Sequence, residues 1–256
     1  SEREEEPVDM LSIERGMKLY SGDILNNIVK FLDRNWINTA SNVLLRHCYP
    51  GYSRVDTKNV TVLKTEYGMF NYNKALQCFP DVFEQIDEYD ISDFSKDDVV
   101  LDIGANIGVF TIKVAPMVKH VIAVEPLFYQ ELKDNVKLNN LENVTCLPYS
   151  LGTGSSFKIN FCGKEAEIQS LKLNDILAKC PYKPNVLKTD CEGGEWAINS
   201  AEEFAEHFDK VEGEFHNFDY LGNKCEPEDW LDSLKAVGYT CTYEHSGRQL
   251  MIHARK

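Results

Sequence analysis

Positive charge is scarce in this chain. Of its 256 residues, 27 are Lys or Arg and 41 are Asp or Glu, which gives a formal net charge of −14. Affinity for nucleic acids and for anionic lipid comes largely from basic side chains, so neither is expected as the main partner. Long apolar runs are also missing, and none approaches the roughly 20 residues that a helix needs to cross a bilayer. The sequence therefore predicts a protein without a membrane span.

Closely spaced cysteine pairs are absent as well. None of the eight cysteines forms a C-x-x-C pair, and their spacing is irregular. Structural zinc and iron–sulfur sites usually show closer pairing, so the pattern predicts scattered reduced thiols and a cytoplasmic protein. Internal repeats and low-complexity segments are also lacking. With 43% hydrophobic residues, the chain is suited to one large folded domain, with or without a smaller appendage.

The first 98 residues carry no motif that points to a chemistry. Their apolar spacing favours a helical and hairpin cap, followed by a connector. We expect this segment to cover the cleft of the domain that follows. Within it we predict helices at residues 24–32 and 42–47, a loop at 49–58, a strand or hairpin between 60 and 72, and a solvated, carboxylate-rich connector at 81–98.

From residue 99 to residue 256, short apolar strands alternate with helical stretches, which is the signature of a parallel α/β sheet. The predicted strands are residues 99–103, 121–124, 144–147, 186–189 and 211–215. The predicted helices are residues 128–138, 196–208 and 227–237. An antiparallel hairpin closes the chain, with strands 239–243 and 249–254 joined by His245, Ser246 and Gly247.

The sharpest local pattern is VVLDIGANIGVFTIKVA at residues 99–115, where a buried strand runs into Gly104, Ala105, Asn106, Ile107 and Gly108 before an apolar helix. Glycines let the backbone turn tightly and approach a ligand closely. Asn106 stands where many nucleotide-binding loops have a glycine, and Asn tolerates positive φ better than most residues. The segment therefore predicts a ligand-binding turn.

Two carboxylates flank this turn and indicate a nucleoside site. Asp102 precedes the turn, and Glu125 ends the next strand, where a carboxylate can accept hydrogen bonds from ribose hydroxyls. A dinucleotide would place its pyrophosphate beside Asp102, and two anions repel each other. S-Adenosylmethionine has a ribose, a sulfonium and an ammonium but no phosphate, so the residues favour it. A loop cap at Asp102 and a surface acid at Glu125 are the alternatives.

Four motifs in order resemble the FkbM-like class I methyltransferases: DIGANIGVF, AVEP, SLKLNDIL and VLKTDCEGGEW. The match covers residues 99–216, somewhat under half of the chain, and departs from the family pattern at Asn174 in its third motif. It implies an S-adenosylmethionine-dependent methyltransferase with a Rossmann-like sheet of seven strands, the last one antiparallel, flanked by helices. It further implies that the cofactor contacts Asp102, Gly104, Ala105, Asn106, Gly108, Glu125 and, near the adenine, Ser150.

Polar residues at two later strand ends are candidates for the acceptor side, because ligands of open α/β sheets sit at the carboxyl ends of the strands. Asp190 and Glu192 follow the fourth strand and are predicted to orient an acceptor hydroxyl or accept its proton. Glu195 is predicted to cap the following helix instead. His216 follows the fifth strand and is the candidate general base, since its ordinary pKa of about 6.5 suits proton removal near neutrality.

A divalent metal held by Asp190, Glu192 and His216 is compatible with these ligand types, but the spacing does not require one, so no metal site is predicted. The sequence thus predicts O-methylation of a small-molecule or glycan hydroxyl by S-adenosylmethionine. Three alternatives stay open at this point: a methyltransferase acting on protein or RNA, a dinucleotide-dependent oxidoreductase, and a non-catalytic scaffold.

Overall fold

The computed structural model describes residues 51–58, 60–72, 75, 81–161, 164–198, 200–220, 223–246 and 249–256. The chain separates into two compact units, Ser1–Glu84 and Gln85–Lys256. The helices predicted at 24–32 and 42–47 fall outside the described residues. No helix in the described part of the chain is long and apolar enough to cross a membrane.

The described part of the first unit is a small antiparallel sheet in the order β1-β2-β3. Strands β2 (Thr61–Lys64) and β3 (Met69–Asn71) confirm the predicted hairpin. Strand β1 (Ser53–Asp56) lies inside the predicted loop 49–58, so that prediction is wrong. Its four residues are too few to show a pattern of their own, and they become a strand by pairing with β2. Helix α5 (Asp81–Glu84) ends the unit.

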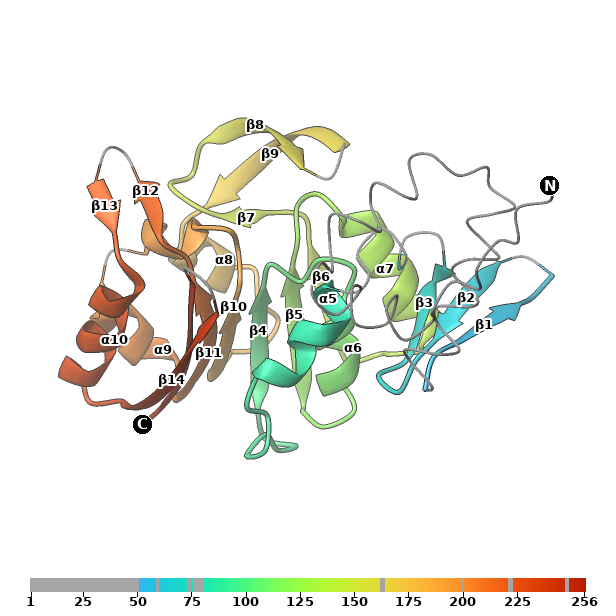
Figure 1. Cartoon of the computed structure of the whole chain (residues 1–256), viewed down its shortest axis with the longest axis horizontal. Coiled ribbons are helices and arrows are strands. Elements are labelled where there is room, and N and C mark those ends of the chain that lie inside the picture. The colour runs from blue at the N-terminus through green and yellow to red at the C-terminus, as the bar shows by residue number, and fades with distance from the viewer. Residues whose placement is uncertain are drawn as a thin grey trace, which may run out of the picture. The chain divides into compact units, whose positions relative to one another are not determined.

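The second unit is built on a seven-stranded sheet in the order β14-β15-β11-β10-β4-β5-β6 (Figure 1). Only β15 runs antiparallel to its neighbours, and the other pairings are parallel. This arrangement confirms the predicted Rossmann-like class I methyltransferase sheet with its antiparallel last strand. The strands are β4 (Val99–Ile103), β5 (His120–Val124), β6 (Val144–Leu147), β10 (Val186–Thr189), β11 (Lys210–Phe215), β14 (Thr240–Ser246) and β15 (Gln249–Arg255).

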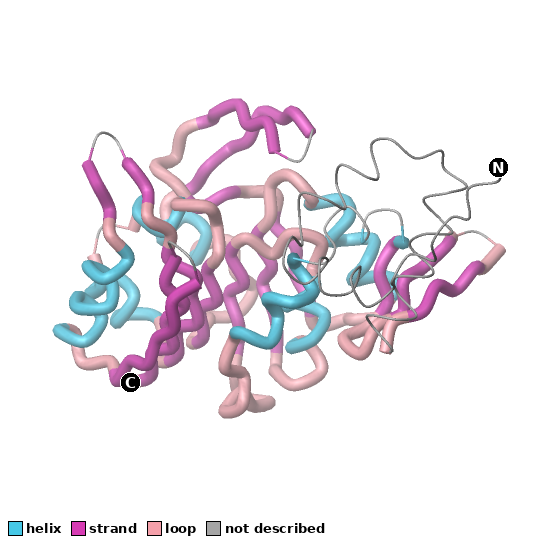
Figure 2. Tube along the Cα trace, in the orientation of Figure 1, coloured by secondary structure: helices cyan, strands magenta, loops and turns pink. Residues whose placement is uncertain are grey.

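Helices cover both faces of this sheet (Figures 1 and 2). One group of helices is α6 (Val109–Val114) and α7 (Tyr129–Leu138), and the other is α8 (Leu173–Leu177), α9 (Ala201–His207) and α10 (Pro227–Ala236). Leu101, Leu187 and Val211 point to the face that packs against α8, α9 and α10, in one large apolar core. On the opposite face, Ala123 packs against Leu132 of α7.

The helix predicted at 196–208 is wrong as one continuous element. A 3-10 helix, η2 (Gly194–Ala197), ends at Ile198, whose backbone is extended with ψ 130°. Ser200 is also extended, and α9 begins at Ala201. The apolar spacing of 196–208 is genuine, because Phe204 and Phe208 are buried. The pattern therefore found the buried face but could not show the break in the backbone.

Several short strands lie in segments for which the sequence predicted no structure. Strands β8 (Ser156–Phe161) and β9 (Lys164–Leu171) form a hairpin, and β7 (Ser150–Leu151) pairs with β9 in parallel. Strands β12 (Phe218–Tyr220) and β13 (Asn223–Cys225) form a second antiparallel hairpin. In the closing hairpin, β14 continues through His245 and Ser246, so these two residues belong to a strand and not to the predicted turn.

Residues 85–98 differ from the solvated connector that the sequence predicts. The segment opens with the 3-10 helix η1 (Gln85–Glu88), and Ile86, Tyr89 and Phe94 are buried. The Asp98 carboxylate accepts a hydrogen bond from Asn185 Nδ2 at 2.8 Å and lies 3.0 Å from Lys210 Nζ. The many acidic residues of this segment favoured a solvated connector, although an apolar residue recurs every few positions. Those apolar residues are buried and pack the segment into the second unit.

Candidate active site

The predicted ligand-binding turn, residues 104–108, connects β4 to α6 in a backbone conformation that requires its sequence. Gly104 has φ +79° and Gly108 has φ +94°. A Cβ atom on Gly104 would lie 1.8 Å from the backbone oxygen of Asp190, which excludes every other residue type there. Asn106 takes φ +51°, as the sequence predicts for this position. The backbone of the turn therefore lies in close contact with the backbone at the end of β10.

Glu125 holds the turn from the end of β5. Its Oε2 accepts a hydrogen bond from Asn106 N at 3.0 Å, and its Oε1 accepts from Leu127 N at 2.6 Å and Phe128 N at 2.9 Å. Burial raises the pKa of Glu125, and the three backbone hydrogen bonds partly offset that rise. Ala105 N donates to Val124 O at 3.2 Å, which fixes the turn to the same strand. Glu125 thus lies beside the glycine turn, where the sequence placed it.

Asp102 lies beneath the turn and is fully buried. Its Oδ2 accepts a hydrogen bond from Thr111 Oγ1 at 2.5 Å, and its Oδ1 is 3.2 Å from Lys188 Nζ. Lys188 also donates to Gly104 O at 3.1 Å. Asp102 therefore supports the turn through Lys188 and α6. Its predicted contact with the cofactor stays a prediction.

Ser150 begins β7, after the third strand of the main sheet. Its Oγ is buried and has no hydrogen-bond partner among the described residues. A buried hydroxyl without a partner is costly, so this atom has capacity for a ligand. The predicted contact of Ser150 with the adenine stays a prediction.

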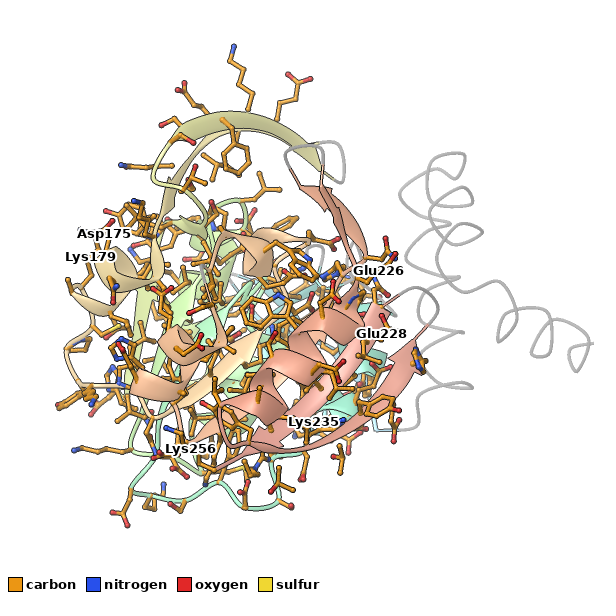
Figure 3. All side chains as sticks on the ribbon, turned by 90° about the vertical axis from the view of Figure 1, so that its left-hand side faces the viewer. Asp175, Lys179, Glu226, Glu228, Lys235 and Lys256 are labelled. Atoms are coloured by element: carbon orange, nitrogen blue, oxygen red, sulfur yellow. The ribbon has the colours of Figure 1, made fainter. Side chains whose placement is uncertain are left out.

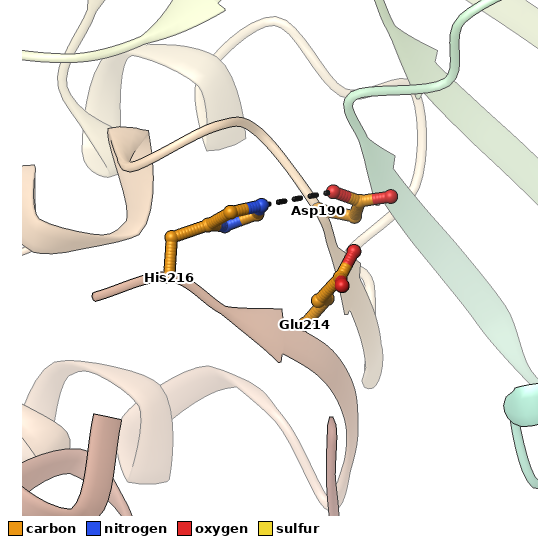
Figure 4. A group of neighbouring side chains, drawn as sticks. All are labelled: Asp190, Glu214 and His216. Carbon is orange, nitrogen blue, oxygen red and sulfur yellow. Dashed lines mark ion pairs between the residues drawn. The ribbon is translucent and has the colours of Figure 1, made fainter. Parts of the chain in front are cut away.

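On the acceptor side, the structure brings the predicted residues Asp190, Glu192 and His216 together. His216 Nε2 is 3.9 Å from Asp190 Oδ1 and 3.7 Å from Glu192 Oε2. Glu192 has φ +53°, and its side chain is 69% exposed, whereas His216 is buried. Figure 4 shows Asp190 and His216 facing each other across the ends of β10 and β11.

Glu195 has a different role from the predicted helix cap. It is fully buried, and its Oε1 accepts a hydrogen bond from His216 N at 2.8 Å and lies 2.9 Å from His216 Nδ1. Its Oε2 accepts from Gly193 N at 3.1 Å. The helix break after η2 explains the difference, because Glu195 belongs to a short 3-10 turn that faces the end of β11. Glu195 therefore fixes the orientation of the His216 ring.

Glu214 and Tyr89 are site residues that the sequence did not select. One ligand-type atom from each of Asp190, Glu214 and His216 lies within 4.8 Å of the others. Glu214 could have been noticed as a charged residue inside an apolar strand that is buried on both faces. Tyr89 O–H donates to Asp190 Oδ2 at 3.2 Å, but it is 101 residues away in the chain and no motif marks it.

The charges of the site shift two pKa values. Burial alone would lower the pKa of His216, but its hydrogen bond to Glu195 and the charges of Glu195, Asp190 and Glu192 raise it to about 9. Burial and the charge of Asp190 raise the pKa of Glu214 to about 7. The pKa of His216 therefore lies above the ordinary value of about 6.5 on which its predicted role as general base rested, and that role stays a prediction.

No family model matches the chain, so membership of the FkbM-like family stays a prediction. Among solved structures, the chain is similar to the fibrillarin pre-rRNA processing protein of Methanococcus jannaschii, with a TM-score of 0.47 and 15% identity over 80% of this chain and 87% of that one. For precorrin-6y C5,15-methyltransferase of Geobacter metallireducens the values are 0.45 and 14%, over 68% and 87%. For M. jannaschii TYW2 in complex with AdoMet they are 0.44 and 16%, over 80% and 85%.

Proposed function

We propose that this chain is an S-adenosylmethionine-dependent methyltransferase whose cofactor binds over the glycine turn at residues 104–108. The supporting observation is the place of that turn in the sheet. The chain passes from β4 to β5 and β6 on one side and then returns to β10 on the other side of β4. Ligands of open α/β sheets bind where the strand order reverses in this way, outside the carboxyl ends of the strands.

The charge around the turn favours a cationic cofactor. Glu125 lies at one side of the turn, and Asp190 and Glu192 lie at the end of the adjacent strand β10. A sulfonium and an ammonium gain Coulomb energy from such carboxylates, whereas a pyrophosphate would be repelled. The hydrogen of Asn106 N, which a phosphate would need, is already donated to Glu125. These features count against the alternative of a dinucleotide-dependent oxidoreductase.

Methyl transfer to an acceptor hydroxyl follows from the residues on the acceptor side. The acceptor oxygen attacks the methyl carbon in line, the new C–O bond forms as the C–S bond breaks, and neutral S-adenosylhomocysteine leaves. Asp190 and Glu192 orient the hydroxyl, and the Glu192 carboxylate receives its proton. Holding the two reactants in line supplies most of the rate enhancement, because the sulfonium methyl is already an activated electrophile. The acceptor is a small molecule or a glycan.

The direct test is transfer of a labelled methyl group. The protein is incubated with methyl-labelled S-adenosylmethionine and separate pools of metabolites, glycans, proteins and RNA, and each pool is analysed by mass spectrometry. We expect label in the metabolite or glycan pool, lost with Glu125→Gln and kept with Glu142→Gln, an exposed acid that removes the same charge. Label confined to protein or RNA would overturn the acceptor class. No label in any pool, together with binding of NADH, would overturn the proposal.

A further inference from the structure

Asp190, Glu214 and His216 bring two carboxylates and an imidazole together at the carboxyl ends of β10 and β11. Their ligand-type atoms lie within 4.8 Å of one another, Glu214 and His216 are buried, and Asp190 is partly exposed. Figure 4 shows the three side chains converging, Glu214 from β11, His216 from the residue after β11 and Asp190 from the residue after β10. Ligand atoms around an ion with bonds of about 2.1 Å lie about 3 to 4 Å apart, so small side-chain rotations would close the group around one ion.

The orientation of His216 is a second observation that points to a ligand. Glu195, which is not one of the three, occupies Nδ1 and the backbone N–H of His216. The ring is thereby fixed so that Nε2 points toward Asp190. Although His216 is buried, Nε2 makes no hydrogen bond to any described residue, because its nearest carboxylate oxygens are 3.7 and 3.9 Å away. Histidines that bind metals almost always donate their other ring N–H to a carboxylate, a backbone carbonyl or water, and Glu195 is such a carboxylate.

Local charge agrees with a cation at this point. Four carboxylates surround the single imidazole: Asp190, Glu192, Glu195 and Glu214. The buried Lys188 is already paired with Asp102 beneath the glycine turn. Backbone geometry also holds the group steady, since Asp190 N donates to Ile103 O at 3.1 Å.

We propose that Asp190, Glu214 and His216 bind one divalent metal ion beside the cofactor turn. Mixed oxygen and nitrogen ligands suit first-row ions such as Mn²⁺ or Zn²⁺ better than Mg²⁺ or Ca²⁺, which prefer oxygen alone. The ion would hold the acceptor oxygen next to the sulfonium methyl and lower the pKa of that hydroxyl. This role in methyl transfer rests on the proposed function, whereas the metal site itself does not.

The test uses Mn²⁺, whose electron paramagnetic resonance signal falls when the ion leaves water for a protein site. The full chain is stripped with chelator and titrated with Mn²⁺ in the absence of cofactor. We expect one bound ion per chain. Asp190→Asn, Glu214→Gln and His216→Gln should each weaken binding at least about tenfold, and Glu195→Gln, which keeps all three ligands, by about 10- to 100-fold. The control Glu228→Gln removes one charge on the exposed surface of α10 (Figure 3) and should bind like the wild type.

Circular dichroism of each variant reports whether the sheet is folded, and binding of S-adenosylhomocysteine, measured separately, tests the proposed function alone. Stoichiometric Mn²⁺ binding that depends on the three ligands supports the metal site whether or not a methyl acceptor is found. A wild type that binds no Mn²⁺ or Zn²⁺ at millimolar concentration overturns it. So does Mn²⁺ affinity that is unchanged in the partly exposed Asp190→Asn variant, whose folding is least at risk.

Discussion

Gly104 and Gly154 form a natural pair for measuring what the turn requires of a single residue. Both have positive φ, +79° and +94°, so alanine is strained at either position. At Gly104 the added Cβ would also meet Asp190 O at 1.8 Å, whereas at Gly154 it meets nothing within 4 Å. Strain alone costs about 1 to 2 kcal/mol, and overpacking adds about 1 to 3 kcal/mol.

We therefore expect Gly104→Ala to lower the free energy of unfolding by about 1 to 3 kcal/mol more than Gly154→Ala, as measured by urea denaturation. Equal stability of the two variants would contradict the close contact between Gly104 and the backbone of Asp190.

Lys188 and Asp102 form a buried ion pair under the turn. Each charge offsets the free-energy cost of burying the other. Lys188→Met leaves a fully buried carboxylate without its counter-ion, and breaking such a pair costs about 3 to 5 kcal/mol. Adding Asp102→Asn removes the stranded charge, so the double variant should be more stable than Lys188→Met alone. Thermal and chemical unfolding of the three proteins provide the measurement. A double variant less stable than Lys188→Met would show that the pair is not coupled.

Single residues of the site were predictable only where a local motif marks them. The glycine turn and Glu125 stand in a strand–turn–helix pattern, and Asp190 and His216 follow apolar strands, so their meeting at one edge follows from parallel topology. Glu195 was misjudged because its partner, His216, is 21 residues away and the break before α9 is not visible in the apolar spacing. The ring orientation of His216 therefore had no sequence signal.

Among the elements, α10 packs on the sheet through Trp230. Its ring lies 4.8 Å from that of Phe204 in a T-shaped contact and 5.7 Å from that of Phe215. Its Nε1 is buried with no hydrogen-bond partner among the described residues. Trp230→Ala should cost about 3 to 5 kcal/mol of unfolding free energy, because it opens a large cavity.

Trp230→Phe keeps an aromatic ring but a smaller one, which costs packing, and it removes the unsatisfied N–H, which is a gain. Because these two effects oppose each other, the loss of unfolding free energy should be under about 1.5 kcal/mol. Chemical denaturation compares the two variants. Equal losses would mean that the ring contacts of α10 contribute little.

Strands β11 and β15 are joined by a network of charged side chains. Glu212 Oε2 lies 2.6 Å from His253 Nδ1, and Glu212 Oε1 accepts from Arg255 at 2.7 Å. The hydrogen bond to Glu212 raises the pKa of His253, although burial opposes this. A raised folded-state pKa gives stability that is fully present below the unfolded pKa of about 6.5 and is lost as the pH rises through the folded value.

The stability advantage of the wild type over His253→Gln should therefore be largest near pH 5.5 and shrink toward pH 9. Subtracting the variant removes the contributions of His216 and Glu214, which titrate in the same range in both proteins. Unfolding free energies across this range provide the measurement. An advantage that grows with pH would contradict the assigned pKa direction.

Elements of the main sheet were predictable because parallel strands are buried on both faces and appear as apolar runs. All five residues of β4 and of β5 are buried, and the sequence located both within one residue. Strand β9 was missed because most of its residues are polar, whereas β8 alternates polar and apolar residues over only six positions and lies outside the main sheet. Strand β1 was missed because it is defined by pairing with β2, which a linear pattern does not show.

For the molecule as a whole, strand order and charge together support the proposed cofactor, S-adenosylmethionine. The net charge of −14 disfavours nucleic acid, and part of it lies in the site itself, at Glu125, Asp190 and Glu214. The antiparallel β15 between β11 and β14 also departs from the six-stranded order of dinucleotide-binding sheets.

Calorimetric titration with S-adenosylhomocysteine and NADH tests the central claim most directly. We predict one S-adenosylhomocysteine bound per chain and no heat from NADH. Glu125→Gln places an amide against the backbone N–H groups of the turn, so it should weaken binding about tenfold or more, while Glu142→Gln should bind like the wild type. Binding of NADH without S-adenosylhomocysteine, or unchanged affinity in Glu125→Gln, would contradict the account.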